Sequence, residues 1–189
     1  QNFAEFLQYA RANPNKLTNA SSGNGTVSHL AMEEIKRRAG LSITHVPYKG
    51  SVAGLTDVIS GNVSIALETA SAVRPHVESG RLRGLAVGSA NRLSGVLSPL
   101  PTLIEQGFPD LKAVTWLMML YPAGTPKAHL QSVHQSVNSI MKQPEVQARM
   151  LSIGLQPRLS SSVEETNEYL KTEYQFWADV VKRSGVPKE

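Results

Sequence analysis

An alternation of short apolar segments and amphipathic segments over about the first ninety residues constrains the fold of this chain more than any other feature. The apolar segments have the length and composition of strands, and the segments between them carry apolar residues at helical spacing. The expected strands are residues 17–20, 43–46, 63–67 and 82–87, and the expected helices are residues 2–12, 27–39, 52–60 and 70–79. Strands that alternate with helices across short connections are typical of a parallel sheet covered on both faces. The sequence therefore predicts an α/β fold.

The pattern changes after this region, and the rest of the chain is mostly helical. The expected elements are a short helix at 102–106, a long apolar strand at 113–121, helices at 127–142, 145–152 and 163–183, and a segment with strand character at 155–159. Ser162 and Glu165 have the spacing of a capping box at the start of the last helix. The apolar stripes of these helices need a sheet to cover, and this part of the sequence hardly supplies one.

Composition excludes several classes of function. The 189 residues include no cysteine, which excludes a disulfide framework, a thiolate zinc site and a cysteine nucleophile. The longest apolar run, Trp116 to Tyr121, has six residues, far fewer than the roughly 20 that span a bilayer. The formal net charge is +4, and the basic run Lys36-Arg37-Arg38 lies near the end of an expected helix without interleaved aromatic residues. These features favour a solvated helix face over a nucleic-acid site.

Three polar loops follow three of the expected strands. The loop at 21–26 combines small residues with two glycines and precedes a helix, whose N-terminus carries about half a unit of positive charge. The other two loops are residues 47–51 and the pair at 68–69. Because the carboxyl ends of parallel strands open at one edge of a sheet, the three loops are expected to converge. This predicts a site for an anion such as a carboxylate or a phosphate.

The first loop matches neither of two common phosphate-binding motifs. It lacks the Gly-Lys-Ser/Thr end of a Walker loop, and Ser28 stands where a dinucleotide fingerprint has its third glycine. An ordinary Gly-rich turn with a Ser or Thr cap therefore remains the alternative for this loop considered alone.

A catalytic serine is a second hypothesis for the same loop. Ser21 or Ser22 with His29 and Asp57 has the residue types of a nucleophilic triad. The Gly-x-Ser-x-Gly elbow is missing, because both serines precede the glycines. A hydrolase or transferase that uses the Ser21-Ser22 loop as an oxyanion hole is the enzymatic alternative. A protein-docking module derived from a binding lobe is a third hypothesis.

The histidines do not predict a metal site. His129 and His134 are five positions apart, so they point to different faces of a helix, and neither lies near a pair of carboxylates. Met118 and Met119 with Trp116 are expected to pack in the core of the long strand rather than to contact a cofactor. We expect no metal and no cofactor.

The ordered set of motifs in this chain resembles the Bug-type solute-binding proteins, which are the TctC-like receptors of tripartite tricarboxylate transporters. The matching segments are Ser21-Ser22-Gly23-Asn24-Gly25-Thr26 with His29-Leu30, His45-Val46-Pro47-Tyr48-Lys49-Gly50, Leu55-Thr56-Asp57 with Gly61-Asn62-Val63, Gly80-Arg81-Leu82-Arg83-Gly84-Leu85-Ala86-Val87, Pro101-Thr102 with Glu105-Gln106-Gly107, and Pro122-Ala123-Gly124-Thr125-Pro126. Each motif is weak alone, but their order from Phe3 to about Val186 is specific.

The resemblance implies a periplasmic, non-enzymatic receptor of the type II periplasmic-binding-protein class. Its two α/β lobes would close in the Venus-flytrap manner over a small organic carboxylate, which is a dicarboxylate, a tricarboxylate or an acidic amino acid. The membrane components of a tripartite tricarboxylate transporter are the implied partners, with no nucleic acid. The implied ligand-binding residues are Ser21, Ser22, Gly23, Asn24, Gly25, Thr26, His29, Pro47, Tyr48, Lys49, Gly50, Ser51, Glu68 and Thr69.

Two departures from the family affect these expectations. Family members often have an Asp-Asn pair where Glu68-Thr69 stands, and the longer Glu68 would repel a dianionic ligand or favour one with an amino group. Family members also have about a hundred more residues before Gln1, which opens without the pattern of a secretory signal. We therefore expect residues 1–118 to form a complete second lobe. Residues 119–189 would then supply a crossing strand and the helical remainder of the first lobe, whose exposed faces favour a homodimer.

Overall fold

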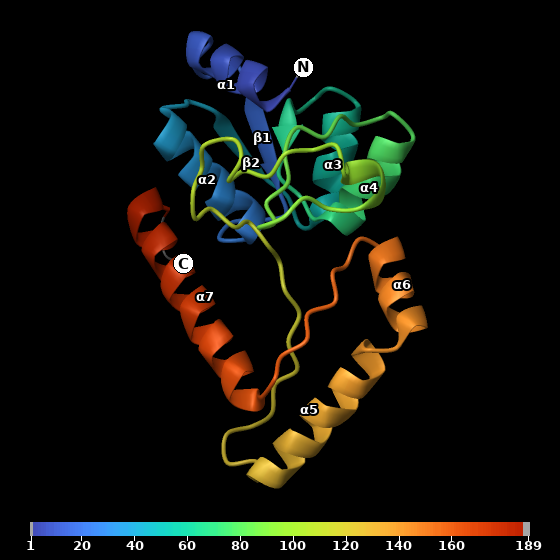
Figure 1. Cartoon of the computed structure of the whole chain (residues 1–189). Coiled ribbons are helices and arrows are strands. Elements are labelled where there is room, and N and C mark those ends of the chain that lie inside the picture. The colour runs from blue at the N-terminus through green and yellow to red at the C-terminus, as the bar shows by residue number, and fades with distance from the viewer. Residues whose placement is uncertain (1, 187–189) are drawn as a thin grey trace. The chain divides into compact units, whose positions relative to one another are not determined.

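The computed structural model describes residues 2–186. The described residues divide into two compact units, which are described separately: residues 2–115 together with 180–186, and residues 116–179. The elements, labelled as in Figure 1, are α1 (Phe3–Ala12), β1 (Thr18–Ser21), α2 (Val27–Ala39), β2 (Thr44–Pro47), α3 (Ser51–Ile59), β3 (Ile65–Ala66), α4 (Ala70–Glu78), the 3₁₀ turn η1 (Gly95–Leu97), α5 (Lys127–Met141), α6 (Pro144–Ser152) and α7 (Val163–Ser184).

A parallel three-stranded sheet in the order β2–β1–β3 forms the centre of the first unit. The chain leaves β1 for one edge strand and then returns across the sheet to the other edge. Because such crossovers are right-handed, α2 and α3 cover opposite faces of the sheet (Figure 1). The predicted α/β architecture, with a parallel sheet flanked by helices, is confirmed.

Local signals in the sequence account for the bounds of α2. Thr26 is its N-cap residue, and the Thr26 hydroxyl accepts a hydrogen bond from the backbone N–H of His29 at 3.4 Å. Gly40 ends the helix with φ at +65°, in the left-handed region that favours glycine. Ile35 on α2 is 1% exposed, so one face of this helix contributes to the core.

Two expected elements of the first unit are not formed. The segment 82–87 is not a strand: Val87 makes one parallel bridge with Thr102, and its N–H donates to the Pro101 carbonyl at 2.9 Å. The segment 102–106 is a turn rather than a helix. In this turn Glu105 Oε2 accepts from the Thr102 N–H at 2.6 Å and Thr102 Oγ1 accepts from the Glu105 N–H at 3.1 Å. These side chains satisfy the backbone locally, and the segment does not continue as a helix.

The second unit consists of α5, α6 and most of α7 with irregular segments between them. The predicted strands at 113–121 and 155–159 are wrong: neither segment pairs with a strand within the described residues. An apolar segment becomes a strand only when a neighbour satisfies its backbone groups. Leu117 is 87% exposed and Met119 is 66% exposed, so the expected core packing of Met119 is also wrong.

Polar contacts organise the second unit where apolar packing is sparse. The indole N–H of Trp116 donates to Glu173 Oε2 at 3.1 Å, and Asn138 Nδ2 donates to the Ser160 carbonyl at 2.7 Å. At the start of α7, the N–H of Glu165 donates to Ser162 Oγ at 3.1 Å. The Glu165 carboxylate accepts from the Ser161 N–H at 2.6 Å, one residue earlier than a standard capping box. None of the helices in residues 2–186 combines the length and apolarity of a membrane crossing.

Candidate functional site

The carboxyl ends of β1, β2 and β3 meet at one edge of the sheet, and a helix begins shortly after each of them. Backbone hydrogen bonds join the first two loops, because the N–H of Tyr48 donates to the Ser21 carbonyl at 3.0 Å and the N–H of Gly50 donates to the Ser22 carbonyl at 3.1 Å. The third loop is joined to the second by Ser51 and Glu68. The structure thus brings the three predicted loops together.

Internal hydrogen bonds fix the conformation of the loop at 21–26. Thr26 Oγ1 donates to the Gly23 carbonyl at 2.7 Å, and Ser28 Oγ accepts from the Ser22 N–H at 3.1 Å. Gly23 has φ at +140°, and a Cβ there would lie 3.4 Å from the Tyr48 carbonyl oxygen, so the position suits glycine. Within residues 2–186, no group accepts a hydrogen bond from the backbone N–H of Asn24. The exposed tip of the loop therefore carries an unpaired donor.

The helices that follow the three loops differ in how their N-termini are satisfied. Thr26 caps α2, but the N-cap residues Gly50 of α3 and Thr69 of α4 make no side-chain cap hydrogen bond in the described part of the chain. The first N–H groups of α3 and α4 are therefore open to other acceptors. Three helix dipoles with their positive ends at one edge favour a negatively charged group there.

Two histidines lie directly behind the loop at 21–26. The rings of His29 and His45 are stacked, with centroids 3.7 Å apart and planes 7° from parallel. His45 Nε2 lies 2.6 Å from Ser21 Oγ, and His29 Nδ1 accepts the backbone N–H of Gly25 at 3.2 Å. Because an amide N–H can only donate, His29 is a neutral imidazole with its proton on Nε2. Burial lowers the pKa of both histidines; the negative charge of Glu33 opposes this shift, and the positive charge of Lys36 adds to it.

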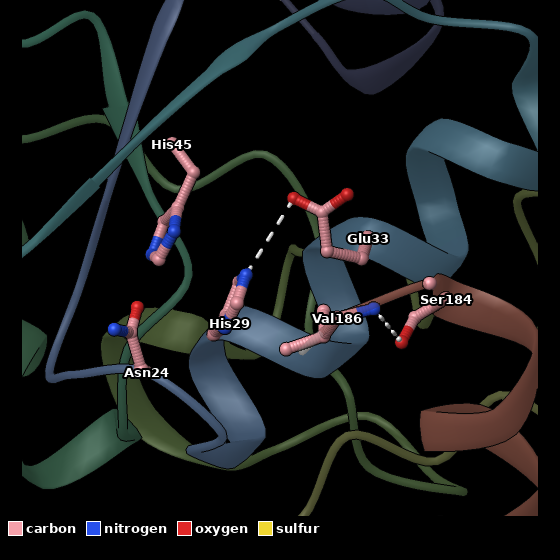
Figure 2. A pocket seen from close by; sticks show the side chains of 7 residues that line it. Asn24, His29, Glu33, His45, Ser184 and Val186 are labelled. Atoms are coloured by element: carbon pink, nitrogen blue, oxygen red, sulfur yellow. Dashed lines mark hydrogen bonds and ion pairs between the residues drawn. The ribbon is translucent and has the colours of Figure 1, made fainter. Parts of the chain in front are cut away.

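A shallow pocket of about 360 Å³ opens beside the two imidazoles. Figure 2 shows His29 and His45 facing each other, with Glu33 one helical turn beyond His29. Glu33 Oε1 is 3.8 Å from His29 Nε2 and 2.6 Å from Lys36 Nζ. The pocket is lined by Asn24, His29, Glu33, His45, Ser184, Gly185 and Val186.

In the second loop, Tyr48 connects the end of β2 to α3. Its hydroxyl donates to Asp57 Oδ2, and Asn62 Nδ2 donates to Asp57 Oδ1 at 3.3 Å. The hydrogen bond from Tyr48, and then that from Asn62, lowers the pKa of Asp57, while the same carboxylate raises the pKa of the Tyr48 phenol. Pro47 and Lys49 on either side of Tyr48 are exposed at the edge of the sheet.

In the third loop, the half-buried Glu68 accepts a 2.6 Å hydrogen bond from Ser51, the first residue of α3. A carboxylate of the protein therefore already lies beside one of the uncapped helix N-termini. Thr69 is exposed, and its hydroxyl accepts from Ser71 Oγ at 3.2 Å. The chemical character of this edge is mixed, with open N–H donors on α3 and α4 and one resident negative charge.

The structure does not assemble the triad of Ser21 or Ser22 with His29 and Asp57. His29 Nδ1 is occupied by Gly25, and Asp57 is bound to Tyr48 and Asn62. The histidine beside Ser21 is instead His45, and Ser21 is 1% exposed. Among residues 2–186, no group of three or more His, Asp or Glu side chains is arranged to hold a metal ion.

Sequence reasoning did not assign three residues to the site: His45 and Ser28, which contact the first loop, and Glu33, which lies beside His29. His45 lies two residues before the end of β2 on the strand next to Ser21, so strand pairing was the signal that could have found it. Ser28 follows the N-cap Thr26 by two positions, where a hydroxyl can reach back to the loop. Glu33 is four residues after His29 on the same helix face.

The family described as "Tripartite tricarboxylate transporter family receptor" matches residues 1–186 of this chain. The chain belongs to the TctC family. Protein BugT of Bordetella pertussis is 30% identical over 179 residues, which cover 95% of this chain and 54% of BugT. A UPF0065 protein from Pseudomonas sp. is 29% identical over 182 residues, which cover 96% of this chain and 54% of that protein. This TctC-family chain thus spans about half the length of the curated relatives that it matches.

Solved structures of TctC-family relatives have the same fold. The structure of R. palustris Rpa4515 with adipate is 32% identical, has a TM-score of 0.86 and matches 98% of this chain and 61% of that chain. The periplasmic binding protein BugD is 27% identical, has a TM-score of 0.82 and matches 100% of this chain and 63% of that chain. The fold is therefore that of the periplasmic binding proteins, as the motifs predicted.

Proposed function

We propose that this TctC-family chain is the carboxylate-binding part of a solute receptor for a tripartite tricarboxylate transport system. The observation that carries the proposal is the convergence of α2, α3 and α4 at the carboxyl edge of the sheet, with α3 and α4 uncapped by side chains. Helix N-termini bind carboxylates through free N–H groups and the helix dipole. A relative 32% identical is known in a structure with adipate, which supports a dicarboxylate.

The proposed contacts come from the residues predicted from the sequence. The loop at 21–26 offers the unpaired N–H of Asn24, and the loops at 47–51 and 68–69 form the walls. We propose that the first unit is one lobe of a two-lobed receptor, and that residues after Thr115 cross to the other lobe. Closure of two lobes excludes water and adds a second set of contacts. The chain alone should therefore bind a carboxylate more weakly than a two-lobed receptor does.

We propose a periplasmic location and no enzymatic activity. Periplasmic binding proteins among the structural relatives support the location. The burial of Ser21 opposes the hydrolase hypothesis, because a nucleophile must reach its substrate. No carboxylate within the described residues hydrogen-bonds the ring of His45 to orient it as a base. A panel of esters should show no hydrolysis; turnover that is lost in Ser21→Ala and Ser22→Ala would instead support the enzymatic alternative.

Binding of adipate, compared with binding of its neutral diamide adipamide, tests the proposed function. The two molecules have the same length, so the difference between them isolates the carboxylates. We expect adipate to raise the melting temperature of the chain and adipamide to leave it unchanged. Malate, citrate and glutamate extend the test to the other expected carboxylate classes. If no carboxylate in this set stabilises the chain and a partner protein does, the docking-module hypothesis replaces this proposal.

A further inference from the structure

The contacts of His29 and His45 converge on the loop that the proposed function uses, and the ring nitrogen of each histidine that faces this loop is already hydrogen-bonded to it. His45 meets the first residue of the loop through Ser21 Oγ at 2.6 Å, and His29 meets its tip through the Gly25 N–H at 3.2 Å. The two rings then support each other through a stack with 3.7 Å between centroids. Together they brace the loop at both ends of the segment that carries the unpaired Asn24 N–H.

We propose that His29 and His45 are positioning residues of the carboxylate loop, and that the binding geometry of the loop requires both imidazoles to be neutral. This proposal rests on the proposed function for its consequence in ligand binding. We call the two histidine contacts with the loop, together with the ring stack, the histidine brace. All of its residues lie in the first unit.

Protonation of His29 would reverse its contact with the loop. In the neutral ring, Nδ1 presents a lone pair to the Gly25 N–H. In the imidazolium, Nδ1 carries a proton, so two donors would face each other at a distance that suits a donor and an acceptor. The peptide between Asn24 and Gly25 must then rotate, and this changes the backbone conformation of the two residues that flank it. Gly25 has φ at +69°, a conformation that glycine leaves easily.

The stack resists a second positive charge. Two imidazolium rings face to face at 3.7 Å would repel each other, so protonation of one ring holds the other neutral. The burial of both rings adds to this resistance and lowers their pKa values.

Among the groups that surround the two rings, one negative charge favours protonation of the imidazoles. On α2, Glu33 Oε1 is 3.8 Å from His29 Nε2, but Lys36 Nζ is closer to the same oxygen, at 2.6 Å. On β1, the neighbours are the uncharged Ser21 and Asn19, the latter being the register partner of His45. From the C-terminal segment, Ser184, Gly185 and Val186 line the same pocket without charge. Within the described residues, Glu33 alone favours the imidazolium, and Lys36 offsets part of its effect.

The test compares the pH dependence of adipate binding in the wild-type chain with that in His29→Asn and His29→Ala. The amide oxygen of asparagine can accept the Gly25 N–H near the position of Nδ1, but it does not titrate. Between about pH 8 and about pH 5, wild type should lose roughly tenfold more affinity than His29→Asn, because only wild type titrates at this contact. Protonation of adipate itself affects binding to both proteins equally, so it cancels when their pH profiles are compared. His29→Ala should bind at least about fivefold more weakly than His29→Asn at pH 8.

Two outcomes of the binding experiment would overturn the proposal. Equal pH profiles for wild type and His29→Asn would show that the neutral state of His29 is not required. A wild-type affinity that rises on acidification relative to His29→Asn would show that the imidazolium binds the carboxylate directly. His45→Gln keeps a polar group near the position of Nε2. This variant therefore separates the contribution of the contact with Ser21 from that of the rest of the imidazole ring.

A measurement without ligand separates this proposal from the proposed function. The imidazole nitrogen shifts of His29 and the amide shift of Gly25 are followed by NMR over the same pH range. We expect the Gly25 amide to titrate with His29 in wild type and to stay constant in His29→Asn. If no carboxylate binds but this coupling is present, the proposed function fails and the brace stands. If Gly25 does not follow His29, the brace fails whatever the chain binds.

Discussion

The hydroxyl of Ser51 donates a 2.6 Å hydrogen bond to the carboxylate of Glu68, which holds a negative charge beside the uncapped N-terminus of α3. Under the proposed function, the distal carboxylate of a dianionic ligand docks at this N-terminus, because its N–H groups are open. We propose that Glu68 competes with the ligand for that position. A ligand with an amino group at this end would gain an ion pair instead of a repulsion.

Replacement of Glu68 by glutamine should therefore raise the affinity for adipate about fivefold, since removal of one like charge near 4 Å in a water-rich site is worth about 1 kcal/mol. The same substitution should weaken the binding of free glutamate, because the amino group of this ligand would lose its negatively charged partner. Isothermal titration calorimetry measures both. Ser51→Ala is the matched control, because it removes the hydrogen bond but keeps the charge, and it should not strengthen adipate binding. Equal adipate affinities for wild type and Glu68→Gln would contradict this role.

A second prediction concerns Glu34, which is fully buried on α2 and accepts hydrogen bonds from Arg37 at 2.9 and 2.8 Å and from Arg38 at 2.6 Å. The bond from Arg37, opposed by burial and aided by Arg38, lowers the pKa of Glu34 from 4.5 to about 2. Because the folded pKa lies below the unfolded value, the stabilisation is fully present above about pH 4.5. It is lost as pH falls toward about 2.

Glu34→Gln should lower the free energy of unfolding by about 2 to 3 kcal/mol at neutral pH, and it should flatten the acid limb of the stability profile. Hydrogen exchange of the α2 amides at several pH values measures this locally. Glu78→Gln is the control, because its pair with Arg74 is at the surface and Glu78 is 52% exposed. If stability falls as steeply at acid pH in Glu34→Gln as in wild type, Glu34 is not the cause of the acid-induced loss of stability.

A third prediction follows from the link between Tyr48 and Asp57. Tyr48→Phe removes the donor that contributes most to lowering the pKa of Asp57, so that pKa should rise toward its ordinary value. Asn62→Ala removes the smaller contribution and should raise it less. Titration of the Asp57 carboxyl carbon by NMR distinguishes the two variants. A larger rise in Asn62→Ala than in Tyr48→Phe would reverse the assigned order of causes.

How far the sequence predicts this structure depends on whether an element is satisfied locally. The helix at 27–39 has its own cap in Thr26 and its own stop in Gly40, and its predicted range is confirmed. The segment 113–121 is as apolar as a core strand, but it pairs with no strand in residues 2–186. A strand depends on a neighbour that its own sequence cannot specify. For the same reason, 82–87 is reduced to the single bridge at Val87.

The candidate site also combines features that the local sequence predicts with features that depend on contacts between distant segments. The three loops could be placed at one edge because parallel βα units fix where such loops lie. The ring stack of His29 and His45 could not be found from spacing, because it depends on which face of β2 meets α2 across the pairing of β1 with β2. The family resemblance placed His29 among the ligand-binding residues. Its contact with Gly25 depends on a side-chain orientation that only the folded chain defines.

A fourth prediction concerns Asn19, which is 1% exposed on the central strand and whose side-chain oxygen and nitrogen both lack a hydrogen-bond partner among residues 2–186. A buried amide without partners is costly, and valine has a similar volume and suits a strand. Asn19→Val should raise the free energy of unfolding by about 1 to 2 kcal/mol, measured by urea denaturation. In the control Thr18→Val, the Ser64 N–H loses its acceptor at 3.0 Å, so stability should fall. A loss of stability in Asn19→Val would show that this amide is satisfied in solution.

A fifth prediction concerns the apolar segment of the second unit, where Leu117 is 87% exposed and Leu120 is 73% exposed. We propose that these side chains favour association between copies of the chain, because each buried contact removes apolar area from water. Leu117→Ser with Leu120→Ser should weaken self-association about tenfold, measured by sedimentation velocity over a range of concentrations. Val52→Ser is the control, because Val52 is 82% exposed on α3 in the first unit and should not change the sedimentation profile. A double variant that sediments like wild type at every concentration would show that this segment does not drive association.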